Sequence, residues 1–294
     1  MKKDAVAAII VLYNPNWDLL SRVINASSLQ CDKIIAIDNS PQNNVDKFDS
    51  LFKNLKNVSY LALLNNYGIA YAQNRGLEIV KNEDYEFVVF FDQDSEPETG
   101  MIQVLKEDIK FLQSNSYKVA TIGPLPSNSQ TNEIYQPRIF KNKKINIGSK
   151  DFYKTKQIIS SGGLMSVSVF DKVGGFSEEL FIDGVDHEWC WRAKKYGLDT
   201  YLSTRTKLIH NLGEGDEKLL GIHIATTSPF RLYYQYRNYI ILVFRSYVPL
   251  YWKLNNLIKY SVKLVYYPIK HKDLKIVKNI FRGINDGFKM LRKK

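Results

Sequence analysis

Five short apolar runs, separated by helical stretches, dominate the first part of the chain. The runs are rich in Val, Ile and Phe and lie at Val6–Leu12, Lys33–Asp38, Val58–Leu64, Glu86–Phe91 and Val119–Gly123. Stretches of helical composition lie at Asp18–Ser27, at Gly68–Lys81 and from Pro97 to about Leu112. Because the runs are apolar on both faces, they are typical of strands in a mostly parallel sheet that helices cover on both sides. The sequence therefore predicts an α/β fold.

Polar side chains follow three of these strands. Asn14 comes after the first strand, Asp38 ends the second, and Asp92-Gln93-Asp94 follows the fourth. In sheets of this type, ligands bind beyond the carboxyl ends of the strands. We therefore expect the functional site at these three strand ends.

The run Val88–Phe91 leads into the sharpest of these features, the pair Asp92 and Asp94. Residues i and i+2 share one face of a strand, so both carboxylates can approach one ion. Mg²⁺ and Mn²⁺ prefer such oxygen ligands and are often completed by substrate phosphates. Two alternatives are a solvated turn and a phosphatase with Asp92 as nucleophile, although in those enzymes the motif usually opens the domain.

A second acidic group lies in the segment from Phe181 to Arg192. Asp183, Asp186 and Glu188 surround the expected start of a helix, where the helix dipole favours ionised carboxylates. An ionised carboxylate is what a general base for a hydroxyl group requires. The alternative is that Asp186 only caps the helix.

Three further segments carry weaker signals. Asn66–Gly76 places small residues at a helix start, where backbone N–H groups can approach a phosphate; the alternative is that they only allow close packing of the helix. Ser127–Lys156 is polar and predicts a loop or hairpin. His210 ends an apolar strand. A zinc site formed by His187, Cys190 and His210 is not favoured, because the sequence contains few Cys and His residues.

The net charge of +11 is unevenly distributed along the chain. Residues 228–294 contain 15 Lys and Arg, two acidic residues and 14 of the 38 aromatic residues. Residues 1–227 contain 26 basic and 28 acidic residues. The change in composition at Ser228-Pro229 therefore predicts a nearly neutral domain, 1–227, and a basic, aromatic helical segment, 228–294.

Interleaved aromatic and basic side chains are typical of helices that lie on an anionic membrane surface. Packing on the domain, dimerisation, and binding of single-stranded nucleic acid are alternatives, but no RNA-binding motif supports a nucleic-acid partner. No apolar run approaches the roughly 18 residues of a membrane span, and Cys31 and Cys190 cannot form a disulfide framework. We expect a cytoplasmic protein that is peripheral on a membrane surface.

In their order along the chain, these segments resemble the family 2 glycosyltransferases with the GT-A fold, and most of all the bacterial rhamnosyltransferases. The resemblance covers about Val6 to Gly213 and rests on Val11–Pro15, Ile37–Ser40, Asn66–Gly76, Asp92–Ser95, Ser160–Leu164, Asp183–Arg192 and His210. No single motif is decisive, but the ordered set is specific. It implies a GT-A domain followed by the helical segment.

The resemblance also implies a role for each matching position. The nucleotide would be held by Tyr13, Asn14, Asp38, Asn39, Gly68, Asn74, Asp92 and Gln93. The divalent ion, Mg²⁺ or Mn²⁺, would be held by Asp92, Asp94 and His210. The donor or acceptor sugar would contact Gly162, Gly163, Asp183, Glu188, Trp189 and Arg192. Asp186 would be the catalytic base, with Asp183 as the alternative because many relatives have Glu-Asp where this chain has Asp183-Gly184.

The implied reaction is an inverting, metal-dependent transfer of L-rhamnose from dTDP-L-rhamnose. The acceptor would be a glycan or a polyprenyl-diphosphate-linked glycan in the synthesis of a bacterial cell-surface polysaccharide such as O-antigen. UDP-galactofuranose or a UDP-hexose is the alternative donor, and an oligomer through the C-terminal helices is open. An alternative of another class is a basic membrane- or nucleic-acid-binding module with structural carboxylates.

Overall fold

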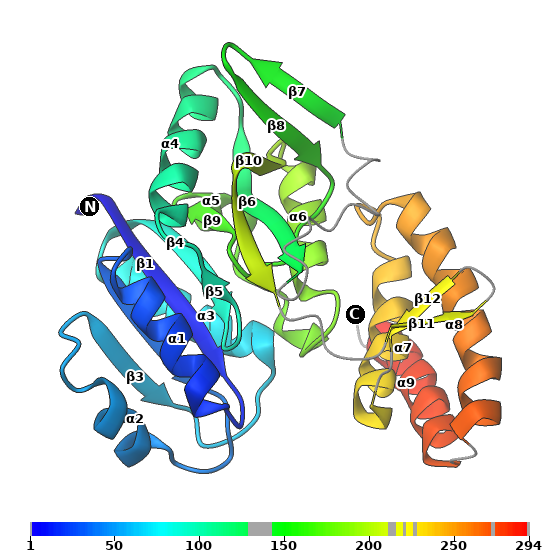
Figure 1. Cartoon of the computed structure of the whole chain (residues 1–294). Coiled ribbons are helices and arrows are strands. Elements are labelled where there is room, and N and C mark those ends of the chain that lie inside the picture. Colours follow the sequence, from blue (N-terminus) through cyan, green and yellow to red (C-terminus); the bar gives the residue numbers. More distant parts are fainter. Residues whose placement is uncertain are drawn as a thin grey trace.

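The computed structural model describes residues 2–128, 143–210, 216–219, 222–225, 228–271 and 274–292. The strands are β1 (Lys2–Leu12), β2 (Lys33–Asp38), β3 (Val58–Ala62), β4 (Tyr85–Asp92), β5 (Glu96–Pro97), β6 (Val119–Asn128), β7 (Lys143–Ile147), β8 (Lys150–Thr155), β9 (Leu164–Ser166), β10 (Asp199–His210), β11 (Asp216–Leu219) and β12 (Ile222–Ala225). The helices are α1 (Trp17–Ser28), α2 (Val45–Phe52), α3 (Ile69–Asn82), α4 (Met101–Ser114), α5 (Val169–Val173), the 3₁₀ turn η2 (Glu178–Leu180), α6 (Val185–Lys195), α7 (Pro229–Val243), α8 (Leu250–His271) and α9 (Leu274–Arg292). Figure 1 shows their arrangement.

One large sheet crosses the molecule in the strand order β3-β2-β1-β4-β9-β6-β10-β8-β7. The strands β3, β2, β1 and β4 pair in parallel, as do β6 and β10. The short strand β9 runs antiparallel to β4 and β6, and the hairpin β7–β8 extends the sheet antiparallel to β10. The prediction of a mostly parallel sheet in an α/β fold is confirmed, and the antiparallel part lies around β9 and at the β7–β8 edge.

Helices cover both faces of the sheet, as the two-sided apolar runs predict. Along β1, Ala8 and Ile10 face a cluster that includes side chains of α1, α2 and α4. Ala7 and Ile9, one position out of phase, face a cluster that includes side chains of α3, α5 and α6. Because successive side chains of a strand point to opposite faces, both halves of the apolar run are buried.

The structure differs from the predicted helix start at Pro97 and agrees in part with the predicted hairpin after Ser127. Pro97 does not begin a helix: Glu96 and Pro97 pair with β10 as the two-residue strand β5, and α4 starts at Met101. A proline has no N–H to donate, so a short, peripheral strand accommodates it. The polar stretch after Ser127 is partly a hairpin, as expected, with β7 and β8 joined by a tight turn, while residues 129–142 lie outside the described part of the chain.

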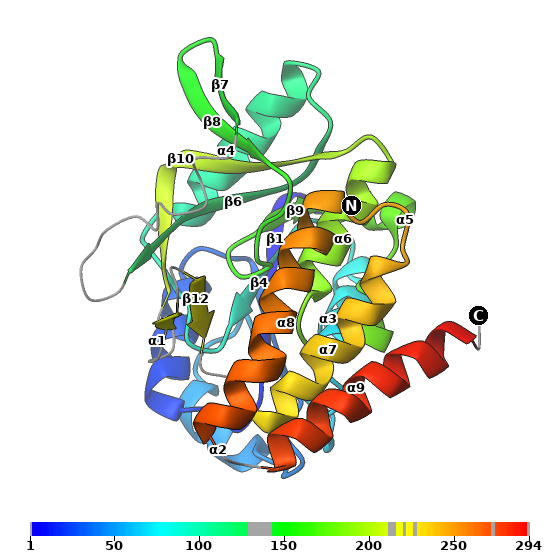
Figure 2. The ribbon, with the colours of Figure 1, turned by 90° about the vertical axis from the view of Figure 1, so that its right-hand side faces the viewer.

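The C-terminal helices pack against the domain and against each other (Figure 2). Ile241 and Leu242 of α7 join the apolar cluster of α3, α5 and α6. Leu232, Tyr236 and Tyr267 form a further buried cluster with Ile276 and Ile280 of α9. The division of the chain at residue 228 into two domains stays a prediction, since α7 shares a core with the preceding residues. In the part of the chain that the structure describes, no helix combines the length and apolarity that crossing a membrane needs.

Candidate active site

The parallel strands bring the predicted polar residues to one edge of the sheet. Asp38 pairs in register with Leu12, and Asp92 with Val11, so both aspartates flank the end of β1. Gln93 ties these ends together, because its side-chain carbonyl accepts from the Tyr13 N–H at 2.8 Å and its amide donates to the Tyr13 carbonyl at 3.2 Å. The polar residues after these strands therefore lie at one edge of the sheet, and their role as a functional site stays a prediction.

Four carboxylates gather at this edge, on Asp92, Asp94, Asp183 and Asp186. Burial and, to a lesser extent, the neighbouring charge of Asp94 raise the pKa of Asp92 to about 6, while Arg231 opposes the shift. Burial also raises the pKa of Asp186 to about 6, with the charges of Asp92 and Asp183 acting in the same direction. Side chains from β4, the loop before α6 and α6 itself thus interact electrostatically, and perturbed pKa values of this kind are typical of functional sites.

Asp94 does not lie on the face of the strand that carries Asp92. β4 ends at Asp92, and a turn closed by the Ser95 N–H and the Asp92 carbonyl, at 3.1 Å, carries Asp94. The expectation that both aspartates share one strand face is therefore wrong. The turn nevertheless keeps the two carboxylates close enough for Asp94 to raise the pKa of Asp92.

The pair suits a hard divalent cation. Both side chains offer carboxylate oxygens, and the charge of Asp94, which adds to burial in raising the pKa of Asp92, is negative charge that a cation would offset. Within the described residues, no group of three or more His, Cys, Asp and Glu side chains is placed to hold a metal ion. A Mg²⁺ or Mn²⁺ ion on Asp92 and Asp94 would therefore take further ligands from water and substrate phosphates, as Mg²⁺ commonly does.

Arg231, at the start of α7, is a site residue that the sequence did not indicate. Its guanidinium donates to both carboxylate oxygens of Asp183, with Nε at 3.0 Å from each and Nη2 at 2.8 Å from Oδ1. This bidentate pair occupies Asp183, whereas burial, Asp92 and Asp183 raise the pKa of Asp186. Ser228 caps α7 by accepting from the Arg231 N–H, so a cap followed by Pro229 was the available signal for this helix start.

The loop that carries Asp183 has an unusual backbone that α7 holds in place. Phe181 and Asp183 have φ values of 63° and 65°, in the left-handed region that non-glycine residues rarely adopt. Arg237 donates to the carbonyls of Glu179 and Leu180, at 2.6 and 2.9 Å. Asn238 directs its buried amide at the carbonyls of this same loop, including that of Asp183 at 2.9 Å. A helix of the basic segment therefore shapes the loop next to the candidate base.

Two of the predicted nucleotide-binding residues are held by hydrogen bonds within the fold. Asp38 is 1% exposed and accepts from the Ser40 N–H at 2.9 Å, from Asn44 at 2.8 Å and from the Tyr60 hydroxyl at 2.7 Å. Asn39 accepts from the Tyr67 N–H at 2.9 Å. These bonds fix the orientation of both side chains but leave little of Asp38 open, so its contact with a base stays a prediction.

Asn14 and Tyr13 lie at the open side of the same edge. Asn14 adopts a φ of 44°, its N–H donates to the Ser40 hydroxyl at 2.8 Å, and its side-chain oxygen accepts from Gln42 at 3.1 Å. Tyr13 is 46% exposed. An exposed aromatic ring beside polar groups is suited to stacking on a nucleobase.

Asn74 serves the fold rather than an open pocket. Its side-chain oxygen accepts from the Phe176 N–H at 2.8 Å, and its amide donates to the Phe176 carbonyl at 3.0 Å and to Glu178 at 2.8 Å. All of these bonds hold the loop between α5 and η2. The contacts therefore do not support a direct contact between Asn74 and a nucleotide.

Gly68 caps α3 with a φ of +89° and lies against the loop at Phe181. A Cβ at this position would be 2.6 Å from the Phe181 carbonyl oxygen and 2.7 Å from its ring. The glycine is required for close packing of α3 on the loop that carries the candidate base. Its predicted role in the nucleotide pocket would thus be indirect.

Replacing Gly68 with alanine is expected to lower the free energy of unfolding by at least about 3 kcal/mol. The cost of a positive φ for alanine adds to the cost of the steric clash between its Cβ and the backbone of Phe181. Gly100→Ala is the matched control: Gly100 has a φ of +81°, but nothing lies within 4 Å of its Cβ position. It should lose only about 1–2 kcal/mol from the backbone conformation. Urea unfolding of both variants measures the difference, and equal losses would contradict the packing role.

The segment Ser160–Gly163 lies beside the end of β4. The Gly162 N–H donates to the Phe90 carbonyl at 2.7 Å, and the Ser161 hydroxyl accepts from the Asp92 N–H at 3.1 Å. Protein atoms fill the positions that a Cβ would occupy, with Leu208 and Pro124 at 3.0 Å from Gly162. The glycines therefore permit close packing behind the carboxylates, and the structure gives no open space at their Cβ positions for a sugar. Ser160, which received no role from the sequence, lowers the pKa of Asp186 by hydrogen bonding.

Glu188, Trp189 and Arg192 are turned away from the carboxylate cluster. Glu188 is fully buried, and Arg192 donates to both of its oxygens, at 2.9 and 3.0 Å. Arg245 at 2.8 Å and the Tyr247 hydroxyl at 2.5 Å bind the same carboxylate. Trp189 is buried and donates to the Gly174 carbonyl at 3.0 Å. The predicted sugar contacts of these three residues are not supported; they join α6 to its neighbours.

The structure does not support a zinc site at His187, Cys190 and His210. Cys190 is buried, and burial raises the pKa of its thiol to about 12, which disfavours the thiolate that binds metal. His210 ends β10 in register with Asn128. The side chain of His210 lies outside the described part of the chain, so its predicted role as a metal ligand stays a prediction.

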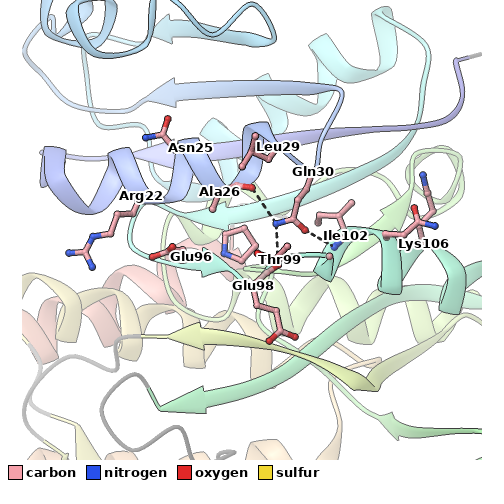
Figure 3. Close-up of a pocket in the computed structure, with 13 residues that line it drawn as sticks. Arg22, Asn25, Ala26, Leu29, Gln30, Glu96, Glu98, Thr99, Ile102 and Lys106 are labelled. Atoms are coloured by element: carbon pink, nitrogen blue, oxygen red, sulfur yellow. Dashed lines mark hydrogen bonds between the residues drawn. The ribbon is translucent and has the colours of Figure 1, made fainter.

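A cleft of about 890 Å³ lies elsewhere, between α1 and the start of α4 (Figure 3). Its side chains include Arg22, Glu96, Glu98 and Lys106. Gln30 crosses its wall, donating to the carbonyls of Ala26 at 3.2 Å and Glu98 at 3.1 Å. None of the described residues that line it belongs to the predicted site, so the carboxylate cluster is the better candidate.

Arg231→Met is expected to make the metal requirement depend more strongly on pH. The arginine charge lowers the pKa of Asp92, so its removal raises that pKa above about 6 and protonates more Asp92 near neutrality. We expect the Mn²⁺ concentration for half-maximal donor binding to increase at pH 6.5 relative to pH 8 by a larger factor than in the wild type. Arg231→Lys keeps the charge and should behave like the wild type; identical pH dependence in Arg231→Met would exclude this electrostatic role.

Comparisons with known proteins agree with this geometry. Residues 7–174 match the family Glycosyl transferase family 2. The chain is 35% identical over 251 residues to the dTDP-rhamnosyl transferase RfbF of Shigella flexneri, covering 83% of this chain and 82% of that protein.

Solved structures show the same fold at low sequence identity. S. aureus TarS 1–349 in complex with UDP-GlcNAc is 15% identical to this chain with a TM-score of 0.55, and the match covers 82% of this chain and 67% of that chain. In a structure of a longer TarS chain, the match covers 40% of that chain. GalNAc-T7 with UDP, GalNAc and Mn²⁺ is 14% identical with a TM-score of 0.54, covering 91% of this chain and 58% of that chain. With the family match over more than half of its length and a 35% identical relative over most of it, this chain belongs to glycosyl transferase family 2.

Proposed function

We propose that this glycosyltransferase moves L-rhamnose from dTDP-L-rhamnose to a hydroxyl group of a glycan acceptor, with inversion at the anomeric carbon. The observation that carries the proposal is that the buried Asp186 carboxylate is close enough to Asp92 at the strand ends for the charge of Asp92 to raise its pKa. The choice of donor is supported by the 35% identity to a dTDP-rhamnosyl transferase over most of both chains.

In the proposed reaction, Asp186 takes the proton of the acceptor hydroxyl while that oxygen bonds to the anomeric carbon. The bond from that carbon to the donor diphosphate breaks, and dTDP leaves with the electron pair. Attack from the face opposite the nucleotide inverts the anomeric configuration. The pKa of Asp186, about 6, suits this role, because the group is mostly ionised at neutral pH and is more basic than an ordinary aspartate.

Asp92 and Asp94 would hold the divalent ion, Mg²⁺ or Mn²⁺, together with the donor diphosphate. When bound, such an ion stabilises the charge that develops on the departing diphosphate. Arg231 adds positive charge beside Asp183 and Asp92, and the loop bonds of Asn238 keep the segment before Asp186 in one conformation.

We also propose where the enzyme acts. A polyprenyl-diphosphate-linked glycan, as an intermediate of a cell-surface polysaccharide such as O-antigen, would be presented at the inner face of the plasma membrane. The enzyme would then be a cytoplasmic, peripheral membrane protein. The excess of 15 Lys and Arg over two acidic residues in 228–294 supports this location, because anionic lipids attract basic segments.

Screening of donors tests the proposal directly. The purified enzyme is incubated with Mn²⁺, a simple sugar acceptor and dTDP-L-rhamnose, UDP-galactofuranose or a UDP-hexose, and the mass of each product is measured. We expect a deoxyhexose to be added from dTDP-L-rhamnose, with the opposite anomeric configuration from that in the donor. Transfer only from a UDP-sugar would reject the choice of donor, and retention of the anomeric configuration would reject the single displacement.

A further inference from the structure

One face of α8 is apolar and exposed. Six large side chains on this helix are between 51% and 68% exposed, namely Leu250, Leu254, Leu257, Ile258, Val265 and Ile269. At 100° per residue they fall within a sector of about 120° on the helix. Near the end of the helix, Ser261, Val262, Val265, Tyr266 and Ile269 line a shallow apolar groove of about 480 Å³. This is a continuous stripe and not a scatter of single exposed residues.

The outer face of α9 combines apolar and basic side chains. Its inner face packs on α7 through Ile276, Ile280, Gly283 and Gly287, where a Cβ on Gly283 would be 2.4 Å from the Tyr233 carbonyl oxygen. The opposite face exposes three large apolar residues at intervals of seven, and cations beside them. These residues are Leu274, Phe281 and Phe288 with Lys275, Lys278, Arg282, Lys289 and Arg292.

α7 lies between α8 and α9 on the side of the molecule that Figure 2 shows. Their buried sides meet in one cluster, which contains Tyr267 of α8 and Ile280 of α9 together with Leu232 of α7. The two exposed faces are consequently turned away from the sheet. Apolar side chains flanked by Lys and Arg are the arrangement of helices that lie in the headgroup region of a bilayer.

We propose that the exposed faces of α8 and α9 dock this enzyme on an anionic bilayer. A second copy of the chain is a poorer occupant, because a symmetric contact would bring together two segments with 15 basic and two acidic residues each. Anionic lipid headgroups complement that charge, and the acyl chains bury the apolar stripe.

Docking through α8 would also bring the carboxylate cluster near the membrane; this step rests on the proposed function. Tyr260 lies on the side of α8 that packs on Tyr236 and Tyr239 of α7. The charges of Asp183 and Arg231 act on its phenol, which places α8 next to the cluster. The apolar stripe lies on the exposed side of the same helix, so α8 separates the cluster from the proposed docking surface. An acceptor sugar attached to a lipid diphosphate would be presented at a similar depth.

Vesicle flotation of the full chain tests the docking surface without any substrate. Vesicles of phosphatidylcholine with and without phosphatidylglycerol are compared for the wild type, for Leu257→Gln/Ile258→Gln and for Lys278→Gln/Arg292→Gln. We expect binding to anionic vesicles at least tenfold above that to neutral ones. Lys278→Gln/Arg292→Gln should lose about 25-fold, since each cation near the surface contributes about fivefold. Leu257→Gln/Ile258→Gln should lose at least about tenfold, because two apolar side chains are no longer buried in the bilayer. Leu29→Gln, an exposed leucine of the sheet domain, is the control and should bind like the wild type.

Three results would overturn the docking proposal: no flotation with anionic vesicles, equal flotation of the wild type and both double variants, or a dimer in sedimentation that Leu257→Gln/Ile258→Gln converts to a monomer. Affinity for dTDP with Mn²⁺, measured without vesicles, should be unchanged in these variants because all four side chains are exposed on helix faces that are turned away from the sheet. A failure of flotation with normal donor binding would reject the surface and leave the transferase function intact. Normal flotation without donor binding would reject the proposed transferase function and leave the docking surface intact.

Discussion

Replacing Asp186 with asparagine is expected to lower kcat for glycosyl transfer by about 10³-fold, while the affinity for dTDP stays within about twofold of the wild type. Asparagine has the shape of aspartate but cannot take a proton, and a positioned general base contributes about 10²–10⁴-fold. The nucleotide would bind at the ends of β1, β2 and β4, which this substitution does not alter. Initial rates and calorimetric binding of dTDP measure the two effects separately.

Asp183→Asn is the comparison that decides between the two candidate bases. Arg231 binds both oxygens of Asp183, so this carboxylate already has a cationic partner and is poorly placed to accept a substrate proton. We expect a smaller loss of kcat than for Asp186→Asn. Near wild-type turnover in Asp186→Asn, or a larger loss in Asp183→Asn, would show that the assignment of the base is wrong.

The same assignment fixes the sign of the pH dependence. Burial and neighbouring carboxylates raise the pKa of Asp186 to about 6, so the protonated, inactive form accumulates as the pH falls below that value. The value of kcat/KM, which reports the free enzyme, should therefore fall on the acid side with a midpoint near pH 6 rather than near 4. A profile that is flat down to pH 5 would contradict the role of this group.

Replacing Asp94 with alanine is expected to abolish the dependence of donor binding on metal. In the wild type, Mn²⁺ should strengthen dTDP binding at least tenfold, because the ion links the carboxylates to the diphosphate. In Asp94→Ala one of two carboxylates is missing, and we expect the affinity with and without Mn²⁺ to agree within about twofold. Calorimetry at a fixed pH measures both affinities.

Two observations separate this effect from a loss of folding. Removing the charge of Asp94 should lower the pKa of Asp92, since that charge helps to raise it to about 6. The variant should also unfold at the same urea concentration as the wild type, because the turn that carries Asp94 contributes little to the core. An Asp94→Ala protein whose dTDP affinity still responds to Mn²⁺ would reject the metal role of this residue.

Much of the fold could be predicted from the sequence, because patterns of neighbouring residues determine most of the strands and helices. The apolar run of β1 buries alternate residues in two clusters, so a doubly covered sheet was the consistent interpretation. Parallel strands end at one edge, and this rule alone placed Asp38 and Asp92 together. Pro97 was misplaced because its pairing partner, β10, lies more than a hundred residues further along the chain.

The site was predicted less completely, because orientation depends on distant partners. Asp186 and Glu188 are two residues apart in α6, and residues at this spacing on a helix do not share a face. One carboxylate therefore reaches the cluster while the other is buried against Arg192 and Tyr247. Asn74 likewise has a polar side chain suited to a nucleotide pocket, but its hydrogen bonds to the backbone of Phe176 hold a loop.

The α/β sheet, the strand ends that carry the polar residues and the concentration of positive charge in 228–294 follow from the order of residues along the chain. The relation of that basic segment to the candidate site depends on three-dimensional packing. Arg231 reaches Asp183 across 48 residues, and Asn238 holds the same loop from the next turns of α7. Composition records that a segment is basic and aromatic, but the packing of α7 on the domain selects which cations turn inward. The same packing buries the inner faces of α8 and α9 and leaves their outer faces exposed.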